Sequence, residues 1–144
     1  MRRSVSWMII FLVLVLALAA QARPAAAAEF SNSDLEGTWS LHAFGVYDVR
    51  GVFYFGTFDL AQNGFISGGA DGAYGWSAAS FSSGGLILKP NGEVGGVING
   101  VAQDRGPFWI AVKLGWMELN KNQITFIGSD DKEYQLLVTL VRVR

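Results

Sequence analysis

Apolar and polar residues alternate along the C-terminal part of the chain with a period of two, the spacing of a half-buried β-strand. Residues 108–114 show the alternation most clearly, with Phe108, Ile110, Val112 and Leu114 on one face. In a final strand, one face is shared by Tyr134, Leu136, Val138, Leu140 and Arg142. The pattern predicts β-structure up to the end of the chain.

Further strands are predicted upstream from short apolar runs between turn residues. They cover residues 37–44, 52–61, 65–70, 84–89, 93–102, 117–119 and 123–127, with a Gly-, Ala- and Ser-rich strand at 73–81. Residues 45–50 are predicted as a loop. Ser31 to Asp34 offer capping side chains before Leu35, which predicts one short helical turn. No other segment has a helical period longer than one turn.

A 28-residue repeat organises the middle of the chain, relating residues 56–72 to residues 84–100. In this alignment Asn63-Gly64 matches Asn91-Gly92, and the glycines at 56, 68 and 72 match those at 84, 96 and 100. Asn-Gly between two apolar runs is a strong hairpin signal, because both residues tolerate a positive φ. Each copy is therefore predicted to form strand, tight turn and strand.

These strands predict an all-β domain: an antiparallel meander of about eight to ten strands closed into a small barrel, with a sandwich as the alternative. Glycines inside strands, such as Gly68-Gly69 and Gly95-Gly96, favour the barrel, because they mark bulges or sharp bends.

Residues 1–28 resemble a secretory signal peptide, which leaves residues 29–144 as a single barrel domain. Arg2 and Arg3 precede an apolar run of fourteen residues, Trp7 to Ala20, and small-residue cleavage sites follow at Ala20-Gln21-Ala22 and Ala26-Ala27-Ala28. The run is short for a membrane anchor. The expected destination is the bacterial periplasm or the outside medium.

Charge and cysteine content exclude several function classes. Cleavage after Ala28 leaves twelve acidic and eight basic residues, a net charge of −4, which disfavours nucleic-acid binding and a basic membrane-seeking face. The chain has no cysteine, so disulfides, thiol catalysis and thiolate metal sites are absent. Neither a cofactor nor insertion of the mature chain into a membrane is expected: the strands are short for an outer-membrane barrel, and the chain ends in Val-Arg-Val-Arg.

The segment Asp34-Leu35-Glu36-Gly37-Thr38-Trp39 resembles the entry to calycin barrels, the lipocalin and avidin group. The resemblance implies a short helical turn, a tryptophan that plugs one end of the barrel, and a chain-end arginine packed across it. Trp39 matches the plug, and Arg142 or Arg144 is the available partner. The Gly-punctuated hairpins also resemble uncharacterised secreted bacterial β-proteins.

Catalytic and metal sites are not predicted. His42 is the only histidine, and no nucleophile or orienting acid stands at a recognisable spacing from it. Asp130, Asp131 and Glu133 are interpreted as a solvated hairpin tip rather than a calcium site. Asp59 shares a strand face with Phe53 and Phe55, which makes it the carboxylate to examine for burial.

Two functional hypotheses follow from the aromatic content. In the first, a secreted non-enzymatic barrel holds a small apolar or amphipathic ligand in its mouth, lined by Phe53, Phe55, Trp76, Trp109 and Trp116. In the alternative, a solid barrel without ligand serves as a structural or interaction module of the cell envelope. Its excess apolar face would then meet another subunit or an envelope protein.

Overall fold

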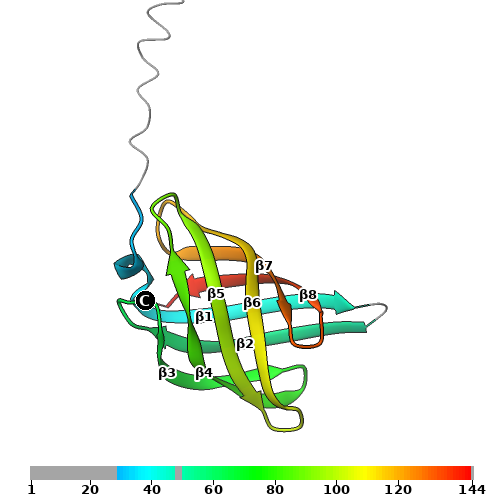
Figure 1. Ribbon diagram of the computed structural model, residues 1–144. Helices are drawn as coiled ribbons and strands as arrows, with labels where there is room; N and C mark the ends of the chain where they lie inside the picture. Colours follow the sequence, from blue (N-terminus) through cyan, green and yellow to red (C-terminus); the bar gives the residue numbers. More distant parts are fainter. Residues whose placement is uncertain (1–28, 48–49, 144) are drawn as a thin grey trace, which may run out of the picture.

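The protein is a closed antiparallel barrel of eight strands in chain order (Figure 1). The computed structural model describes residues 29–47 and 50–143. The expected signal peptide, residues 1–28, lies outside the described residues. One 3-10 turn, η1 (Asn32–Leu35), precedes β1 (Gly37–Tyr47), β2 (Arg50–Leu60), β3 (Ile66–Tyr74), β4 (Ser77–Leu88), β5 (Glu93–Ala102), β6 (Gly106–Met117), β7 (Gln123–Asp130) and β8 (Gln135–Arg142).

The barrel closes where the first strand pairs with the last. β1 pairs with β2 on one side and with β8 on the other, so Trp39 lies opposite both Phe58 and Arg142. This pairing leaves no open sheet edge between the first and last strands, and it distinguishes a barrel from a sandwich. The predicted all-β barrel is therefore confirmed.

Alternate residues of each strand point into the barrel and form one apolar core. The largest fully buried side chains include Trp39, Tyr54, Phe58, Phe81 and Phe126. Leucine, isoleucine and valine from β1, β5, β7 and β8 fill the space between these rings. Within the described residues, no helix is long and apolar enough to cross a membrane.

The segment between residues 70 and 81 differs from the prediction. It does not form a separate strand over 73–81: β3 continues to Tyr74, the chain turns at Gly75 and Trp76, and β4 begins at Ser77. Gly75 has a φ of +58°. Small residues on both sides of the turn gave no apolar alternation from which the boundary could be placed.

The two copies of the repeat form the β2–β3 and β4–β5 hairpins and use the same turn. The Asn63 side chain accepts a hydrogen bond from the Phe65 amide at 3.1 Å, and Asn91 does the same for Glu93 at 3.1 Å. The following glycines, Gly64 and Gly92, have φ values of +83° and +88°. An Asx-type contact followed by a left-handed residue thus sets both hairpins.

Candidate functional site

One end of the barrel is closed by Trp39 beneath η1. Its indole Nε1 donates a hydrogen bond to the Leu35 carbonyl at 2.7 Å, and the side chain is fully buried. The Arg142 guanidinium lies 4.5 Å from the centre of the Trp39 ring and donates to the carbonyls of Asp34 and Glu36. These contacts tie η1, β1 and β8 together, and cation–π attraction adds to the packing.

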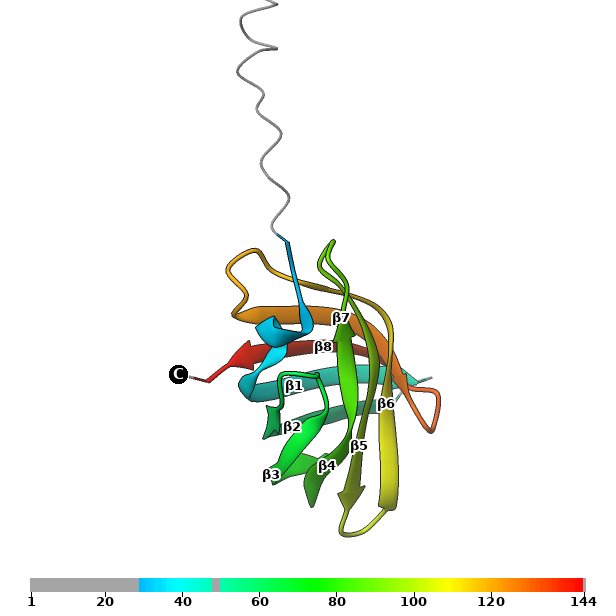
Figure 2. The same ribbon diagram turned by 60° about the vertical axis from the view of Figure 1, so that its left-hand side comes forward.

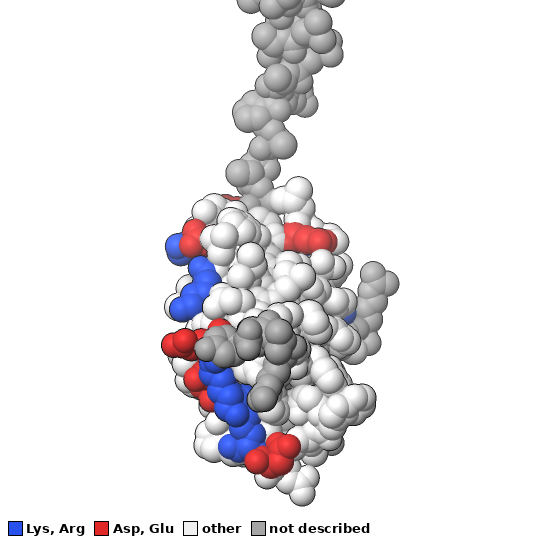
Figure 3. Space-filling view, turned by 90° about the vertical axis from the view of Figure 1, so that its right-hand side faces the viewer, with Lys and Arg blue, Asp and Glu red and all other residues white. Residues whose placement is uncertain are grey.

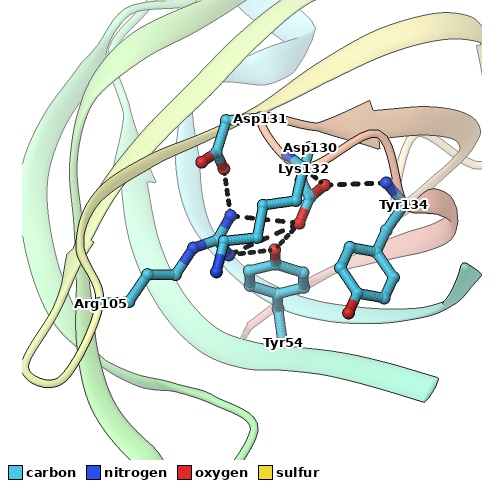
Figure 4. Close-up of polar contacts among 6 residues, drawn as sticks. All are labelled: Tyr54, Arg105, Asp130, Asp131, Lys132 and Tyr134. Carbon is cyan, nitrogen blue, oxygen red and sulfur yellow. Dashed lines mark hydrogen bonds and ion pairs between the residues drawn. The ribbon is translucent and has the colours of Figure 1, made fainter. Parts of the chain in front are cut away.

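The opposite end holds a polar cluster in which the buried side chains of Tyr54, Arg105 and Asp130 meet the exposed Asp131 (Figure 4). Asp130 is fully buried at the end of β7. Its Oδ2 accepts a hydrogen bond from the Tyr54 hydroxyl and lies 3.5 Å from the Arg105 Nη2. Its Oδ1 accepts from the backbone amides of Lys132 at 2.9 Å and Tyr134 at 3.0 Å.

Arg105, from the β5–β6 turn, bridges this end of the barrel. Its side chain is only 6% exposed, donates to Asp131 and, at 3.0 Å, to the Tyr54 hydroxyl, and lies 4.3 Å from the Tyr74 ring centre. Among the described residues, its buried Nε has no hydrogen-bond partner. Figure 3 looks onto this end and shows charged side chains gathered mainly along one side. Both ends of the barrel are therefore closed by an arginine packed on aromatic rings.

The sequence interpretation of Asp130 as part of a solvated hairpin tip was wrong, because its side chain points into the barrel. The alternation of the strand could have predicted this burial. The inward face of β7 is shared by every second residue: Ile124, Phe126, Gly128 and Asp130. A carboxylate at the end of an inward-facing series needs buried partners. Asp131 and Glu133 do lie in the exposed turn.

Burial of Tyr54 should make the protein less stable above pH 10. Burial, reinforced by the hydrogen bond to the Asp130 carboxylate, raises the Tyr54 pKa above the unfolded value of 10.0. The contribution of Tyr54 to the free energy of unfolding is therefore complete below pH 10.0 and is lost as the pH rises above it. Above that pH the unfolded chain releases the tyrosine proton, which the folded chain retains. Urea unfolding from pH 9 to 11.5 should show a shallower decline for Tyr54→Phe than for the wild type. Equal slopes would contradict the assignment.

A groove lies on the outside of the barrel, between the two copies of the repeat. We call it the repeat groove; its lining comprises Asn32, Asn63, Gly64, Phe65, Gly84, Gly85, Leu86, Ile87, Gly96 and Val97. Its volume is about 500 Å³. The turn of the first copy forms one wall, and β4 and β5 of the second copy form the floor. Figure 2 shows the β2–β3 turn beside β4.

The β2–β3 turn is held against β4 by backbone contacts. The Leu86 amide donates to the Gly64 carbonyl at 2.9 Å, and Phe65 forms a β-bridge with Gly85. A Cβ on Gly64 would lie 2.0 Å from the Leu86 carbonyl oxygen, so only glycine allows this close approach. The Asn-Gly of the first repeat therefore shapes the groove as well as the hairpin.

The repeat groove combines apolar walls with two amides. Phe65 and Ile87 are largely exposed beside it. The Asn32 oxygen accepts from the Leu88 amide at 2.8 Å, and the Asn63 oxygen accepts from the Phe65 amide at 3.1 Å, so the group that each side chain can offer a ligand is its amide nitrogen, a donor. An apolar surface with a few convergent polar groups is typical of small-molecule sites.

The five aromatic residues predicted to line the barrel mouth lie outside the barrel. Phe55, Trp109 and Trp116 are outward-facing and about half exposed, Trp76 is 98% exposed in the β3–β4 turn, and Phe53 is partly buried against the Trp76 ring. Strand β2 is apolar on both faces, and Tyr54 and Phe58 occupy its inner face instead. The expected position was therefore wrong, whereas a role in ligand binding stays a prediction.

Four of these five residues belong to one surface, which we call the apolar band. It comprises Phe44, Phe53, Phe55, Trp76, Leu114, Trp116, Ile127 and Leu137. The strand registers align its middle: Phe44 lies opposite Leu137, which lies opposite Ile127, which lies opposite Leu114. The band thus crosses the outer face of β2, β1, β8, β7 and β6, whereas Trp109 lies elsewhere on β6.

The remaining candidates for chemistry lie at the surface. His42 is exposed and contacts the Ser40 hydroxyl, and Asp59 is exposed and accepts from the Thr38 hydroxyl. In the part of the chain that the structure describes, no three histidine or acidic side chains are grouped so as to hold a metal ion.

Comparisons with known proteins support the barrel fold but do not assign the chain to a family. No known protein-family profile and no curated protein matches the chain. Among solved structures, a redesigned β-barrel named mFAP1, bound to DFHBI, is similar, with a TM-score of 0.56 and 15% identity over 78% of this chain and 98% of that one. A fluorescence-activating β-barrel designed de novo has a TM-score of 0.54 and 12% identity over 79% of this chain and 99% of that one. At these identities the likeness shows the fold alone.

Proposed function

We propose that the chain is a secreted, non-enzymatic binding protein that holds a small apolar or amphipathic molecule in the repeat groove. The observation that carries the proposal is the groove's volume of about 500 Å³ with a mainly apolar lining. This volume falls within the range of about 300–1,000 Å³ for ligand sites. The two amide donors would fix one polar acceptor of the ligand, while Phe65 and Ile87 contact its apolar part.

Four further observations support parts of this proposal. The mFAP1 barrel, which has a similar fold, is described as bound to a small molecule, DFHBI. The N-terminal pattern of residues 1–28 supports export to the periplasm or the medium. A single exposed histidine and the absence of cysteine support a non-enzymatic role. The arrangement of Trp39, η1 and Arg142 supports a calycin-like barrel.

A second candidate is a cell-envelope interaction module with a solid barrel. The interior favours it: aromatic rings from β2, β4 and β6 pack against one another, and the arginines at the two ends close it. In that case the outer surface alone would contact a partner. The two candidates differ in whether a small molecule accompanies the protein.

Native mass spectrometry of protein purified from a bacterial host without detergent tests the proposed ligand. We expect an additional mass that leaves on denaturation, and we expect Phe65→Ala to reduce its occupancy at least 10-fold by removing one groove wall. Phe44→Ala is the matched control, because Phe44 is 61% exposed and Phe65 is 62% exposed. The control should retain the additional mass.

Two outcomes would contradict the ligand proposal. A bare wild-type mass would favour the solid-barrel module. An additional mass that survives Phe65→Ala but leaves in Phe44→Ala would move the ligand from the repeat groove to the apolar band.

A further inference from the structure

The apolar band is large for a surface exposed to water. Its middle row, Phe44, Leu137, Ile127 and Leu114, runs across four neighbouring strands, and each of these side chains is about half exposed. A half-exposed large side chain offers about 100 Å². The whole band therefore exposes roughly 700 Å², above the approximate 300–600 Å² of the largest apolar patch on a typical monomer.

Within the described strands, the paired rows of the band contain no charged side chain. Glu118 stands at the edge of the band, beside Trp116. Beside the middle row runs a second register row. In it, Phe55 lies opposite His42, His42 lies opposite Thr139, and Thr139 pairs with strand β7. Aromatic residues thus mark both ends of the band, with hydroxyl and imidazole groups between them. Depletion of charge at the centre and enrichment in aromatics distinguish a protein interface from the rest of a surface.

The surface of the band has a protruding side chain and hollows that can pair with those of a second copy of the chain. Leu137 is 58% exposed and stands between two hollows of similar size, about 360 Å³ and about 340 Å³. Phe44 and Phe55 line the first hollow, and Trp116 and Ile127 line the second. Under a two-fold axis, Leu137 of each copy would enter a hollow of its partner, which gives the reciprocal contacts of an isologous interface.

We propose that the apolar band is the interface of a homodimer of this chain. Two bands face to face would bury roughly 1,400 Å², within the approximate 1,200–2,000 Å² of a stable, specific interface. A lipid surface fits less well, because the mature chain's net charge of −4 would be repelled by anionic headgroups. The dimer leaves the repeat groove open, since the groove lies on β4 and β5.

Sedimentation equilibrium of the purified protein tests the dimer, with Leu137→Asp as the disrupting variant. The wild type should sediment at twice the chain mass at micromolar concentration, and Leu137→Asp should weaken dimerisation at least 100-fold by placing two carboxylates at the interface centre. Val101→Asp is the matched control: Val101 is an outward, 47% exposed residue on β5. The control should remain a dimer.

Cysteine cross-linking provides a readout that does not depend on a destabilising charge. The natural chain has no cysteine, so Leu137→Cys introduces a single thiol near the proposed axis. Mild oxidation should yield a covalent dimer from Leu137→Cys and far less from Val101→Cys. Equal cross-linking of the two variants would overturn the proposal.

Other occupants of the band would give different results. A wild-type monomer at 100 µM would overturn the dimer. Cosedimentation of that monomer with phosphatidylcholine vesicles, lost in Leu137→Asp, would assign the band to lipid instead. Because Phe65 lies outside the band, Phe65→Ala should stay dimeric, so loss of ligand and loss of dimer are separable.

Discussion

Replacing Arg105 by alanine is expected to lower the free energy of unfolding by about 3–5 kcal/mol, because the Asp130 carboxylate would remain buried without its cation. Arg105 and Asp130 are 6% and 0% exposed at their side chains, so solvent screens their interaction little. The variant would also lose the contact of the guanidinium with the Tyr74 ring. Urea unfolding at pH 7, followed by tryptophan fluorescence, measures the loss.

The exposed ion pair between Lys89 and Glu93 provides the matched control. Its atoms lie 2.7 Å apart, closer than those of Arg105 and Asp130, but its side chains are 55% and 38% exposed. Lys89→Ala should therefore cost less than about 1 kcal/mol. If Arg105→Ala cost no more than Lys89→Ala, the buried cluster would contribute little to stability and this end of the barrel would be open to water.

The local turn chemistry could be predicted from the sequence because it depends on neighbouring residues. Asn63-Gly64 and Asn91-Gly92 each supply an amide oxygen and a left-handed glycine within two positions. Such a turn fixes the hairpin and its register. The order of the strands around the barrel follows from a series of hairpins, because each strand then pairs with the next in the chain, whereas closure needs the pairing of β1 with β8.

The inner and outer faces of β2 could not be assigned in the same way. Phe53 and Phe55 alternate with Tyr54 and Phe58, so both faces are apolar and the period of two does not say which one is inside. The register with β1 decides: Trp39 lies inside the barrel and opposite Phe58, which places Tyr54 inside and Phe55 outside. For this reason, the side chains of β2 that were predicted to line the ligand site lie on the outer surface of the barrel.

The sites themselves depend on contacts between distant segments. The repeat groove needs the β2–β3 turn to lie on β4, through the contact of Gly64 with Leu86. The buried cluster joins Tyr54 to Asp130, 76 residues apart. The 28-residue repeat indicated that two equivalent hairpins exist, but a repeat does not show how its copies pack.

Replacing Trp39 by alanine should also cost about 3–5 kcal/mol, because it removes the largest buried side chain and leaves a cavity that the barrel wall cannot fill. The indole contributes its hydrogen bond to Leu35 and its face to Arg142. Its loss would therefore loosen η1 and the end of β8 as well as the core. Urea unfolding measured by circular dichroism gives the free energy without relying on the deleted fluorophore.

The matched control for Trp39→Ala is Trp76→Ala, which makes the same substitution at a side chain that is 98% exposed. It should change stability by less than about 0.5 kcal/mol. A loss well under 1 kcal/mol for Trp39→Ala would remove the argument for a calycin-like plug. A large loss for Trp39→Ala, reproduced in part by Arg142→Ala, would instead show that indole and guanidinium act together. Under that result the chain-end arginine fastens the last strand to the first, which is the closure on which both outer surfaces depend.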